Sequence, residues 1–141
     1  MFLGEYTHAI DDKGRLTIPA KFRGLLAAGL VVTRGFDQNL MVFSLDEWQN
    51  LAQRIAERPL SDEDVRAFRR RVFSGAIDLL PDRQGRILVP PYLREFAGID
   101  GDVVIAGMFN YFELWSVEAW QNVRNSIESS SDASRWEDLG I

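Results

Sequence analysis

The sequence contains no cysteine and only one histidine, His8, among its 141 residues. The lack of cysteine excludes disulfide bonds and thiolate metal ligands, and it is compatible with a reducing cytoplasm. A single histidine also argues against most transition-metal sites and against Ser-His or Cys-His catalysis. We therefore expect neither a metal nor any other cofactor.

Long apolar segments are missing as well. No apolar run approaches the roughly 20 residues that cross a bilayer, and the N-terminus lacks the basic and apolar regions of a signal peptide. The hydrophobic content of 46% is typical of a globular protein. The length and composition therefore predict one compact domain in the cytoplasm, without a membrane partner.

The net charge of -5 is unevenly distributed. Residues 126–141 carry four carboxylates and one arginine, a net charge of -3, which leaves only -2 for the rest of the chain. Binding of nucleic acid depends on a local basic surface and not on the total charge. An acidic tail over 126–141 is thus compatible with a DNA-binding body.

One motif occurs twice, 71 positions apart. The nine residues from Asp11 to Pro19 (DDKGRLTIP) return from Asp82 to Pro90 (DRQGRILVP), and the match extends to Phe22-Arg23 and Leu93-Arg94. A long period copied once differs from a solenoid repeat. Each copy spans about 45 residues, close to the limit of roughly 40 residues for independent folding. We therefore expect two half-domains that share one core.

The residue pattern around each motif predicts strands and short helices. Strands are expected over 4–10, 15–18, 30–33 and 40–43, and a helix over 20–28 that ends at Gly29. Ser44 and Ser61 open two further helices. Apolar stripes place Trp48 in the first copy and Trp120 in the second against the core. The predicted organisation is repeat 1 over 5–47, bridging helices over 48–75, repeat 2 over 76–119 and the acidic tail.

In each copy, the motif consists of Asp-x-x-x-Arg with glycine before the arginine and proline four residues after it. This duplicated order of strand, turn, motif, helix and two strands resembles the MraZ family, bacterial transcriptional regulators built from two SpoVT-AbrB-type repeats. The resemblance extends from about Phe2 to Asn125. It implies a mainly β, α+β fold in which the two repeats form one intertwined AbrB-like, double-psi-type β-barrel with peripheral helices.

The resemblance also implies a function. Members of the family bind double-stranded DNA at direct repeats of a short promoter box and assemble into closed rings. We therefore expect a cytoplasmic, nucleoid-associated repressor that acts upstream of the division and cell-wall gene cluster, including its own gene.

The expected DNA-binding residues lie in and after the two motifs, and they are Asp11, Lys13, Gly14, Arg15, Lys21, Arg23, Arg83 and Arg86. An arginine fork beside a glycine turn suits bidentate contact with guanine, and lysines suit phosphate contacts. Asp11 is placed to pair with Arg15 and to orient it. The alternative is that the Asp and Arg around each hairpin turn only bridge to each other and close the barrel. The second copy replaces Lys13 and Lys21 by Gln84 and Tyr92, so the first copy is the stronger candidate.

Other features leave alternatives open. The cluster of Arg66, Arg69, Arg70 and Arg71 is either a solvated helix face, a contact for a neighbour's acidic tail or a phosphate contact. The aromatic residues Phe109, Tyr111 and Phe112 replace polar residues of the first copy at two positions, so they either form a subunit interface or cover their own domain.

Two other classes of protein are alternatives to a DNA-binding regulator. An enzyme is not expected, because the acids occur in a repeated turn and no phosphate loop, nucleophile elbow or metal spacing is present. A protein-interaction module such as an antitoxin of the same superfamily is usually shorter and has one repeat.

Overall fold

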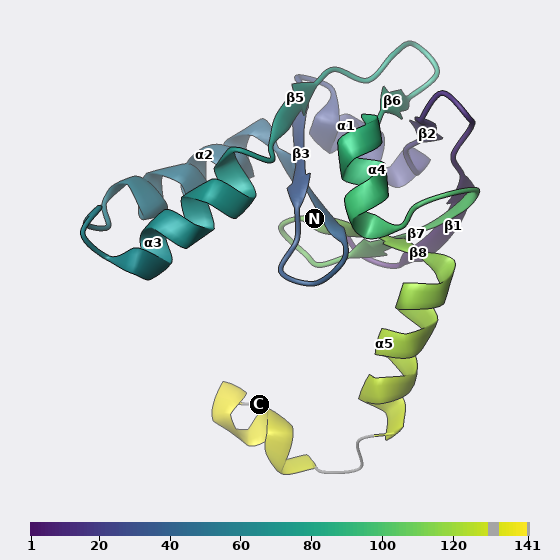
Figure 1. The fold of residues 1–141 in the computed structure, drawn as a ribbon. Helices are drawn as coiled ribbons and strands as arrows, with labels where there is room; N and C mark the ends of the chain where they lie inside the picture. Colours follow the sequence, from purple (N-terminus) through teal and green to yellow (C-terminus); the bar gives the residue numbers. More distant parts are fainter. Residues whose placement is uncertain (130–132, 141) are drawn as a thin grey trace.

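The computed structural model describes residues 1–129 and 133–140, in which two similar series of elements follow one another (Figure 1). The first series is β1 (Glu5–Ala9), β2 (Arg15–Thr17), α1 (Ala20–Leu26), β3 (Leu30–Arg34), β4 (Leu40–Ser44) and α2 (Leu45–Ala56). The second is β5 (Ile77–Leu79), β6 (Arg86–Leu88), α4 (Pro91–Ala97), β7 (Asp102–Gly107), β8 (Phe112–Ser116) and α5 (Val117–Ser129). Between them lie α3 (Glu63–Phe68) and a π-helical turn (Arg69–Phe73), and a 3-10 segment (Ala133–Leu139) follows α5.

Strands from the two repeats are intermixed within one antiparallel sheet. Its order is β1-β7-β8-β4-β3-β5, so the first-repeat strands β1, β4 and β3 each pair with a strand of the second repeat. The predicted α+β class, dominated by antiparallel strands, is confirmed.

A closed barrel is not found among the strand pairings of the described residues, because β1 and β5 remain the sheet's two edges. The strands β2 and β6 form a separate ladder with each other. A single bridge between Ile10 and Leu16 connects that ladder to the end of β1.

The core contains residues from both repeats. Phe22 of α1 and Phe112 of β8 are almost completely buried, and the Phe2 ring lies 5.0 and 5.1 Å from their ring centroids. Leu16 and Ile87, the central residues of β2 and β6, are 0% and 2% exposed. Burial of this kind contributes roughly 1.5–3 kcal/mol for each large apolar side chain. The shared core explains how units of about 45 residues form one stable body.

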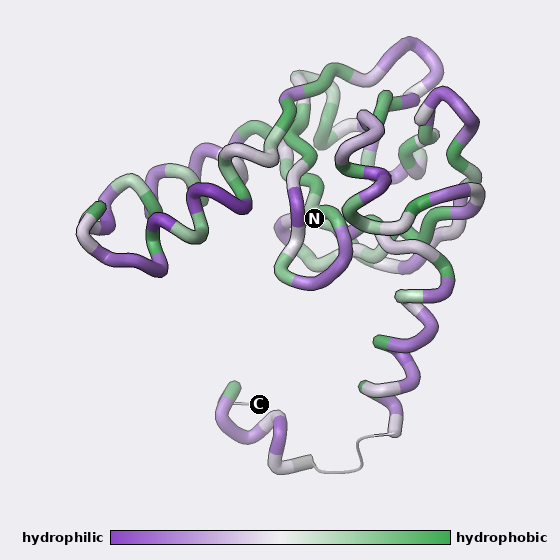
Figure 2. Tube along the Cα trace, in the orientation of Figure 1, coloured by the Kyte–Doolittle hydropathy of each residue, from purple (hydrophilic) through white to green (hydrophobic). Residues whose placement is uncertain are grey.

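Two helical arms extend from this body (Figure 1). One is the hairpin of α2 and α3, and the other is α5. As predicted, the Ser44 hydroxyl caps α2 by accepting a hydrogen bond of 3.3 Å from the Glu47 N–H. Figure 2 shows mixed polar and apolar positions along both arms, whereas the strands of the body are more hydrophobic. No helix of the described residues has both the length and the apolar character required to span a membrane.

The two tryptophans that the sequence predicts to pack against the core lie beside the main core and not within it. Trp48 packs against Phe43 and Phe73, with ring centroids 5.7 and 5.6 Å away, and Trp120 packs against Trp115 at 5.9 Å. Neither helix α2 nor helix α5 has a fully buried residue. Trp48 therefore packs against a small satellite cluster, whereas Trp120 belongs to neither buried cluster of the described residues, so the prediction of core packing is wrong for the main core.

The three aromatic residues of the β7–β8 loop have different environments. Phe112 is 0% exposed in the main core, and Tyr111 stacks on Phe43 at 5.3 Å. Phe109 is 63% exposed and has a φ of 73°. An interface role for Phe112 is therefore wrong, because its own chain buries the ring completely.

Candidate nucleic-acid interface

The first motif forms a tight turn held by the side chain of Asp11. The Gly14 N–H donates to the Asp11 carbonyl at 3.0 Å, and the Asp11 N–H donates to the Arg15 carbonyl at 3.1 Å. One carboxylate oxygen, Oδ1, accepts the backbone N–H groups of Lys13 at 3.0 Å and Arg15 at 2.8 Å. The other, Oδ2, accepts the Arg15 Nε–H at 2.6 Å. A single aspartate therefore fixes both the turn and the arginine that follows it.

The second motif has the same set of hydrogen bonds. Oδ1 of Asp82 accepts the backbone N–H groups of Gln84 and Arg86, each at 2.9 Å, and Oδ2 accepts the Arg86 Nε–H at 2.9 Å. The Gly85 N–H donates to the Asp82 carbonyl at 3.0 Å. The conservation of geometry between copies means that the aspartate, glycine and arginine act as a unit in each turn.

The antiparallel pairing of β2 with β6 joins the two turns through one short ladder, with one turn at each end. Arg15 lies opposite Leu88, and Arg86 lies opposite Thr17. Beyond this ladder, the Val89 N–H donates to the Gly14 carbonyl at 2.8 Å. In the pseudo-equivalent contact, the N–H of Ile18 donates to the Gly85 carbonyl, also at 2.8 Å. Each turn is therefore anchored to the opposite repeat.

Glycine is required in the first turn for two reasons. Gly14 has a φ of 90°, a conformation that side-chain-bearing residues rarely adopt. A Cβ at this position would also lie 2.5 Å from the carbonyl oxygen of Val89 and 2.9 Å from Nε of Arg94. The close approach of the opposite repeat thus leaves no room for a side chain.

Arg15 makes a side-chain hydrogen bond through Nε, and its two Nη groups are not used in this way. Its side chain is 39% exposed, and its ion pair with Asp11 uses only Nε. Neither Nη group makes a hydrogen bond within the part of the chain that the structure describes. Arg86 has the same arrangement, with its side chain 32% exposed. Each guanidinium is therefore fixed at Nε, and its terminal N–H groups remain available to a ligand.

The electrostatics of both aspartates favour their ionised forms. Hydrogen bonds from the Arg15 backbone and then from its side chain lower the pKa of Asp11 from its usual value of 3.8. The Arg86 backbone N–H is the main cause of the lowered pKa of Asp82, although partial burial opposes it. Both carboxylates are therefore charged at neutral pH and available to hold the arginines.

Two further arginines belong to one repeat and contact the turn of the other. Arg23, on α1 of the first repeat, lies against Gly85 of the second turn and donates from Nε to the Ile18 carbonyl at 3.0 Å. Arg94, on α4 of the second repeat, lies against Gly14. Its Nε donates to the Val89 carbonyl at 2.9 Å. Each turn is consequently a composite of both halves of the chain.

Arg94 was not among the residues expected from the sequence. The signal was present, because Leu93-Arg94 is the second copy of Phe22-Arg23. Arg94 lies beside the first turn because of the way the two repeats pair. The spacing of the motifs does not predict that pairing.

The surroundings of the two turns are basic although the whole chain is acidic. Six cationic side chains lie in or against the turns, namely Lys13, Arg15, Arg23, Arg83, Arg86 and Arg94. Three carboxylates accompany them, and two of these are paired with Arg15 and Arg86. Lys13 and Arg83 are exposed at the tips of the turns, and Lys21 is exposed on α1. This surface can attract a polyanion despite the net charge of -5.

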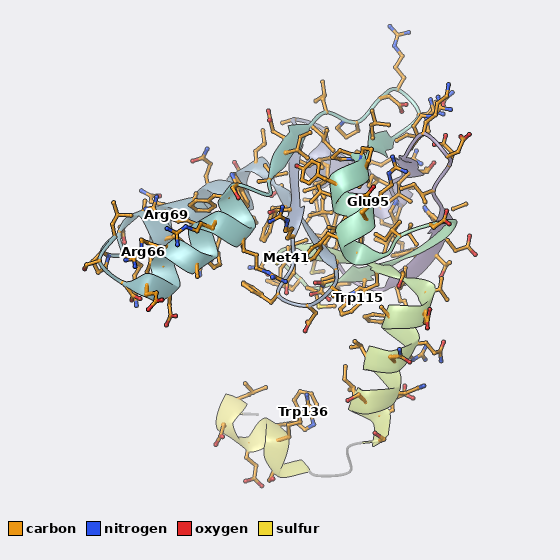
Figure 3. The ribbon with its side chains drawn as sticks, viewed as in Figure 1. Met41, Arg66, Arg69, Glu95, Trp115 and Trp136 are labelled. Atoms are coloured by element: carbon orange, nitrogen blue, oxygen red, sulfur yellow. The ribbon has the colours of Figure 1, made fainter. Side chains whose placement is uncertain are left out.

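The arginine cluster of residues 66–71 lies elsewhere, on the α3 arm (Figure 3). Arg71 donates from Nε to the Gly35 carbonyl at 2.9 Å and lies 5.1 Å from the Phe96 ring centroid. Arg66 donates to the Leu60 carbonyl at 2.8 Å. These two side chains are therefore partly structural, and the cluster does not join the two turns.

Comparison with known proteins agrees with the duplicated architecture. A family model described as "MraZ protein, putative antitoxin-like" matches residues 1–71 and again residues 72–139. The chain belongs to the MraZ family. A protein of Roseiflexus castenholzii named transcriptional regulator MraZ is 51% identical over 131 residues, which are 93% of this chain and 92% of the relative.

Other relatives carry the same name. The protein of Herpetosiphon aurantiacus is 51% identical over 133 residues, 94% of this chain and 93% of its own. The protein of Syntrophomonas wolfei is 46% identical over 143 aligned positions that span both chains completely. Family membership thus rests on similarity along nearly the whole sequence, including both turns.

Proposed function

We propose that the chain is a sequence-specific DNA-binding transcriptional regulator that contacts DNA with its two paired turns. The observation that carries this proposal is the repeated arrangement in which an aspartate holds a partly exposed arginine at Nε, while its Nη groups make no hydrogen bond within the described residues. The names of the relatives, transcriptional regulator MraZ, support the same conclusion. They also fit the expectation that the chain is not an enzyme.

Base recognition is assigned to the terminal N–H groups of Arg15 and Arg86. Two parallel N–H groups match the O6 and N7 acceptors of guanine in the major groove, and such a pair discriminates by about 1–3 kcal/mol. Because the aspartate already orders the guanidinium, less conformational entropy is lost on binding. Each turn therefore acts as a preorganised reading element.

The two turns are not identical as DNA-binding elements. Lys13 accompanies Arg15 in the first turn, whereas Arg83 and Gln84 accompany Arg86 in the second. Lys13, Lys21 and Arg83 are exposed and suited to phosphate contacts, which supply salt-dependent affinity. Arg23 and Arg94 use Nε within the protein and keep their terminal nitrogens for a phosphate.

The family resemblance extends the proposal to the biological target. On this basis the chain is a nucleoid-associated repressor in the cytoplasm. It binds direct repeats of a promoter box upstream of the division and cell-wall gene cluster, including its own gene. A closed ring of copies engages several boxes at once, and such linkage raises overall affinity by roughly 10²–10⁴ without new contacts.

The proposal is tested by fluorescence anisotropy with duplexes taken from immediately upstream of the gene. We expect saturable binding that a scrambled duplex of equal length does not reproduce, and tighter binding as the number of boxes increases. Equal affinity for the upstream and scrambled duplexes would contradict sequence-specific regulation. Equal affinity for one box and for several would contradict only the multivalent arrangement.

The words "putative antitoxin-like" in the family description suggest a second function, the binding of a protein partner. This alternative predicts that a co-expressed protein copurifies with the chain and prevents DNA binding. Purification with and without co-expressed candidates separates the two functions, because a regulator acting alone binds its operator without any partner.

A further inference from the structure

The tips of the two turns differ in the sign of one charge. Position 12 of the first turn is aspartate, and the corresponding position of the second turn is Arg83. Both residues are exposed. Neither the Asp12 carboxylate nor the Arg83 guanidinium makes a hydrogen bond or an ion pair within the described part of the chain. The two side chains therefore add no contact to their own turns, and the difference between them acts on the molecule that approaches the tips.

The second turn has a hollow beside it that suits an anion. This hollow lies between α1 and the turn, and it is lined by Arg23, Ala27, Pro81, Asp82, Arg83 and Gly85. The guanidinium of Arg23 lies against Gly85, where a Cβ would be 2.4 Å from its Nε. Because that Nε donates to the Ile18 carbonyl, the two Nη groups of Arg23 remain for a ligand. Two guanidinium groups thus line one small hollow.

The carboxylate that also lines this hollow is already compensated. Oδ1 of Asp82 accepts the backbone N–H groups of Gln84 and Arg86, and Oδ2 accepts the Arg86 Nε–H at 2.9 Å. The charges of Arg23 and Arg83 have no such partner among the described residues. A phosphate can therefore approach both guanidinium groups, and each contact is a charge-assisted hydrogen bond.

The corresponding place at the first turn has a different balance of charge. Arg94 lies against Gly14 as Arg23 lies against Gly85, but Asp12 stands where the second turn has Arg83. The next residue is Lys13 in the first turn and Gln84 in the second, so the two tip positions carry a net charge of 0 and +1. An unpaired carboxylate repels a phosphate that comes close to it. The first tip is therefore a poorer site for the DNA backbone.

A carboxylate on a DNA-binding surface has a favourable partner among the bases. In the major groove, aspartate characteristically accepts a hydrogen bond from the N4 amino group of cytosine. Asp12 precedes Arg15 by three residues on one tight turn, so the two side chains reach neighbouring base pairs. The first turn is thus equipped to read a cytosine and a guanine, and the second to read a guanine and hold a phosphate.

We propose that Asp12 gives the chain one orientation on DNA, by accepting a hydrogen bond from a cytosine amino group beside the guanine that Arg15 reads. At the second turn, Arg23 and Arg83 bind a backbone phosphate instead. A chain with two equivalent turns would bind a box equally well in either direction, and Asp12 removes that equivalence. The inference rests on the proposed function, because it requires that both turns contact DNA.

The test is a scan of single base-pair substitutions in the upstream duplex, with relative affinities measured by anisotropy. For the wild type we expect a C·G pair whose replacement lowers affinity roughly fivefold or more. This pair should lie next to a guanine whose contribution is lost in Arg15→Ala. Asp12→Asn should remove the preference for cytosine at that pair and leave the other positions unchanged. It should also raise affinity for a scrambled duplex, because a charge that repels phosphates is gone.

The matched control is Arg83→Gln, at the equivalent position of the second turn. Affinity should fall by similar factors for all duplexes, and the slope of log K against log salt concentration should decrease by about 1. The exchange Asp12→Arg/Arg83→Asp keeps the net charge and should move the cytosine preference to the base pair beside the guanine read by Arg86. Circular dichroism verifies that each variant is folded.

The outcomes separate this inference from the proposed function. If the wild type prefers the upstream duplex and Asp12→Asn keeps every base preference, the role of Asp12 is wrong and the proposed function stands. Loss of a single base preference in Arg83→Gln, with an unchanged salt slope, would also overturn the inference. A wild type that binds the upstream and scrambled duplexes equally would contradict both.

Discussion

Arg94 of the second repeat lies across Gly14 of the first, so closely that a Cβ on Gly14 would be 2.9 Å from the arginine Nε. The pseudo-equivalent contact joins Arg23 to Gly85. Each repeat therefore contributes the turn of one reading element and the supporting arginine of the other. This exchange makes the geometry of each turn depend on the docking of the two halves, and it leads to tests of both stability and binding.

Gly14→Ala is expected to destabilise the fold. The left-handed conformation costs a residue with a Cβ about 1–2 kcal/mol, and the contact with the Val89 carbonyl adds to this. The matched control is Gly24→Ala on α1, where no atom lies within 4 Å of the new Cβ. Alanine in a helix should raise the free energy of unfolding there by about 0.5–1 kcal/mol. Urea denaturation measures both, and equal effects would contradict the close packing of the first turn.

Because Arg23 and Arg94 each contact the turn of the other repeat, removal of either arginine should perturb the amide resonances of that other turn. Arg94→Ala should shift the amide resonance of Gly14 more than that of Gly85, and Arg23→Ala should do the reverse. Heteronuclear NMR spectra of the two variants measure these shifts directly. If each arginine instead affected mainly the turn of its own repeat, the composite construction of the turns would be wrong.

The Asp11 carboxyl is expected to titrate below its usual value of 3.8 in a pH series followed by NMR. Because the folded-state pKa is lower than the unfolded one, the stabilisation by this group is present at neutral pH and is lost as the pH falls through the folded-state pKa. Arg15→Ala should raise the pKa only in part, since the Arg15 backbone N–H remains as the largest cause. A titration at or above 3.8 in the wild type would contradict the hydrogen-bonded turn.

Lys13→Ala is expected to weaken binding to specific and non-specific DNA by similar factors. Loss of one phosphate contact should reduce the slope of log K against log salt concentration by about 1. Anisotropy titrations over a series of salt concentrations give this slope. A selective loss of operator affinity with an unchanged slope would instead assign Lys13 to base recognition.

Much of the candidate site was predictable because its chemistry is local. The aspartate, the turn glycine and the arginine lie within five residues, and their duplication excluded a chance match. The exchange of Arg23 and Arg94 was not predictable from spacing, because it depends on which strands pair across the repeats.

For the fold, too, local elements were predictable from the sequence and long-range contacts were not. The amphipathic pattern predicted both helices with tryptophans, but it did not predict that α2 forms a hairpin with α3, whereas no α-helix follows α5 within residues 1–129 and 133–140. The pairing of β2 with β6 and the open edges of the larger sheet also depend on long-range contacts. Local propensity determines where the helices and strands form, and the docking of the two repeats determines which of their surfaces are exposed.

The central claim is that Arg15 reads DNA from a base fixed by Asp11, and Arg15→Ala tests it most directly. This side chain is 39% exposed, so its removal should leave the circular dichroism spectrum unchanged. Anisotropy with the upstream duplex should show operator affinity reduced to that for a scrambled duplex. Asp11→Ala should weaken binding less, because the guanidinium remains but is no longer oriented. Wild-type operator affinity in a folded Arg15→Ala protein would contradict the account.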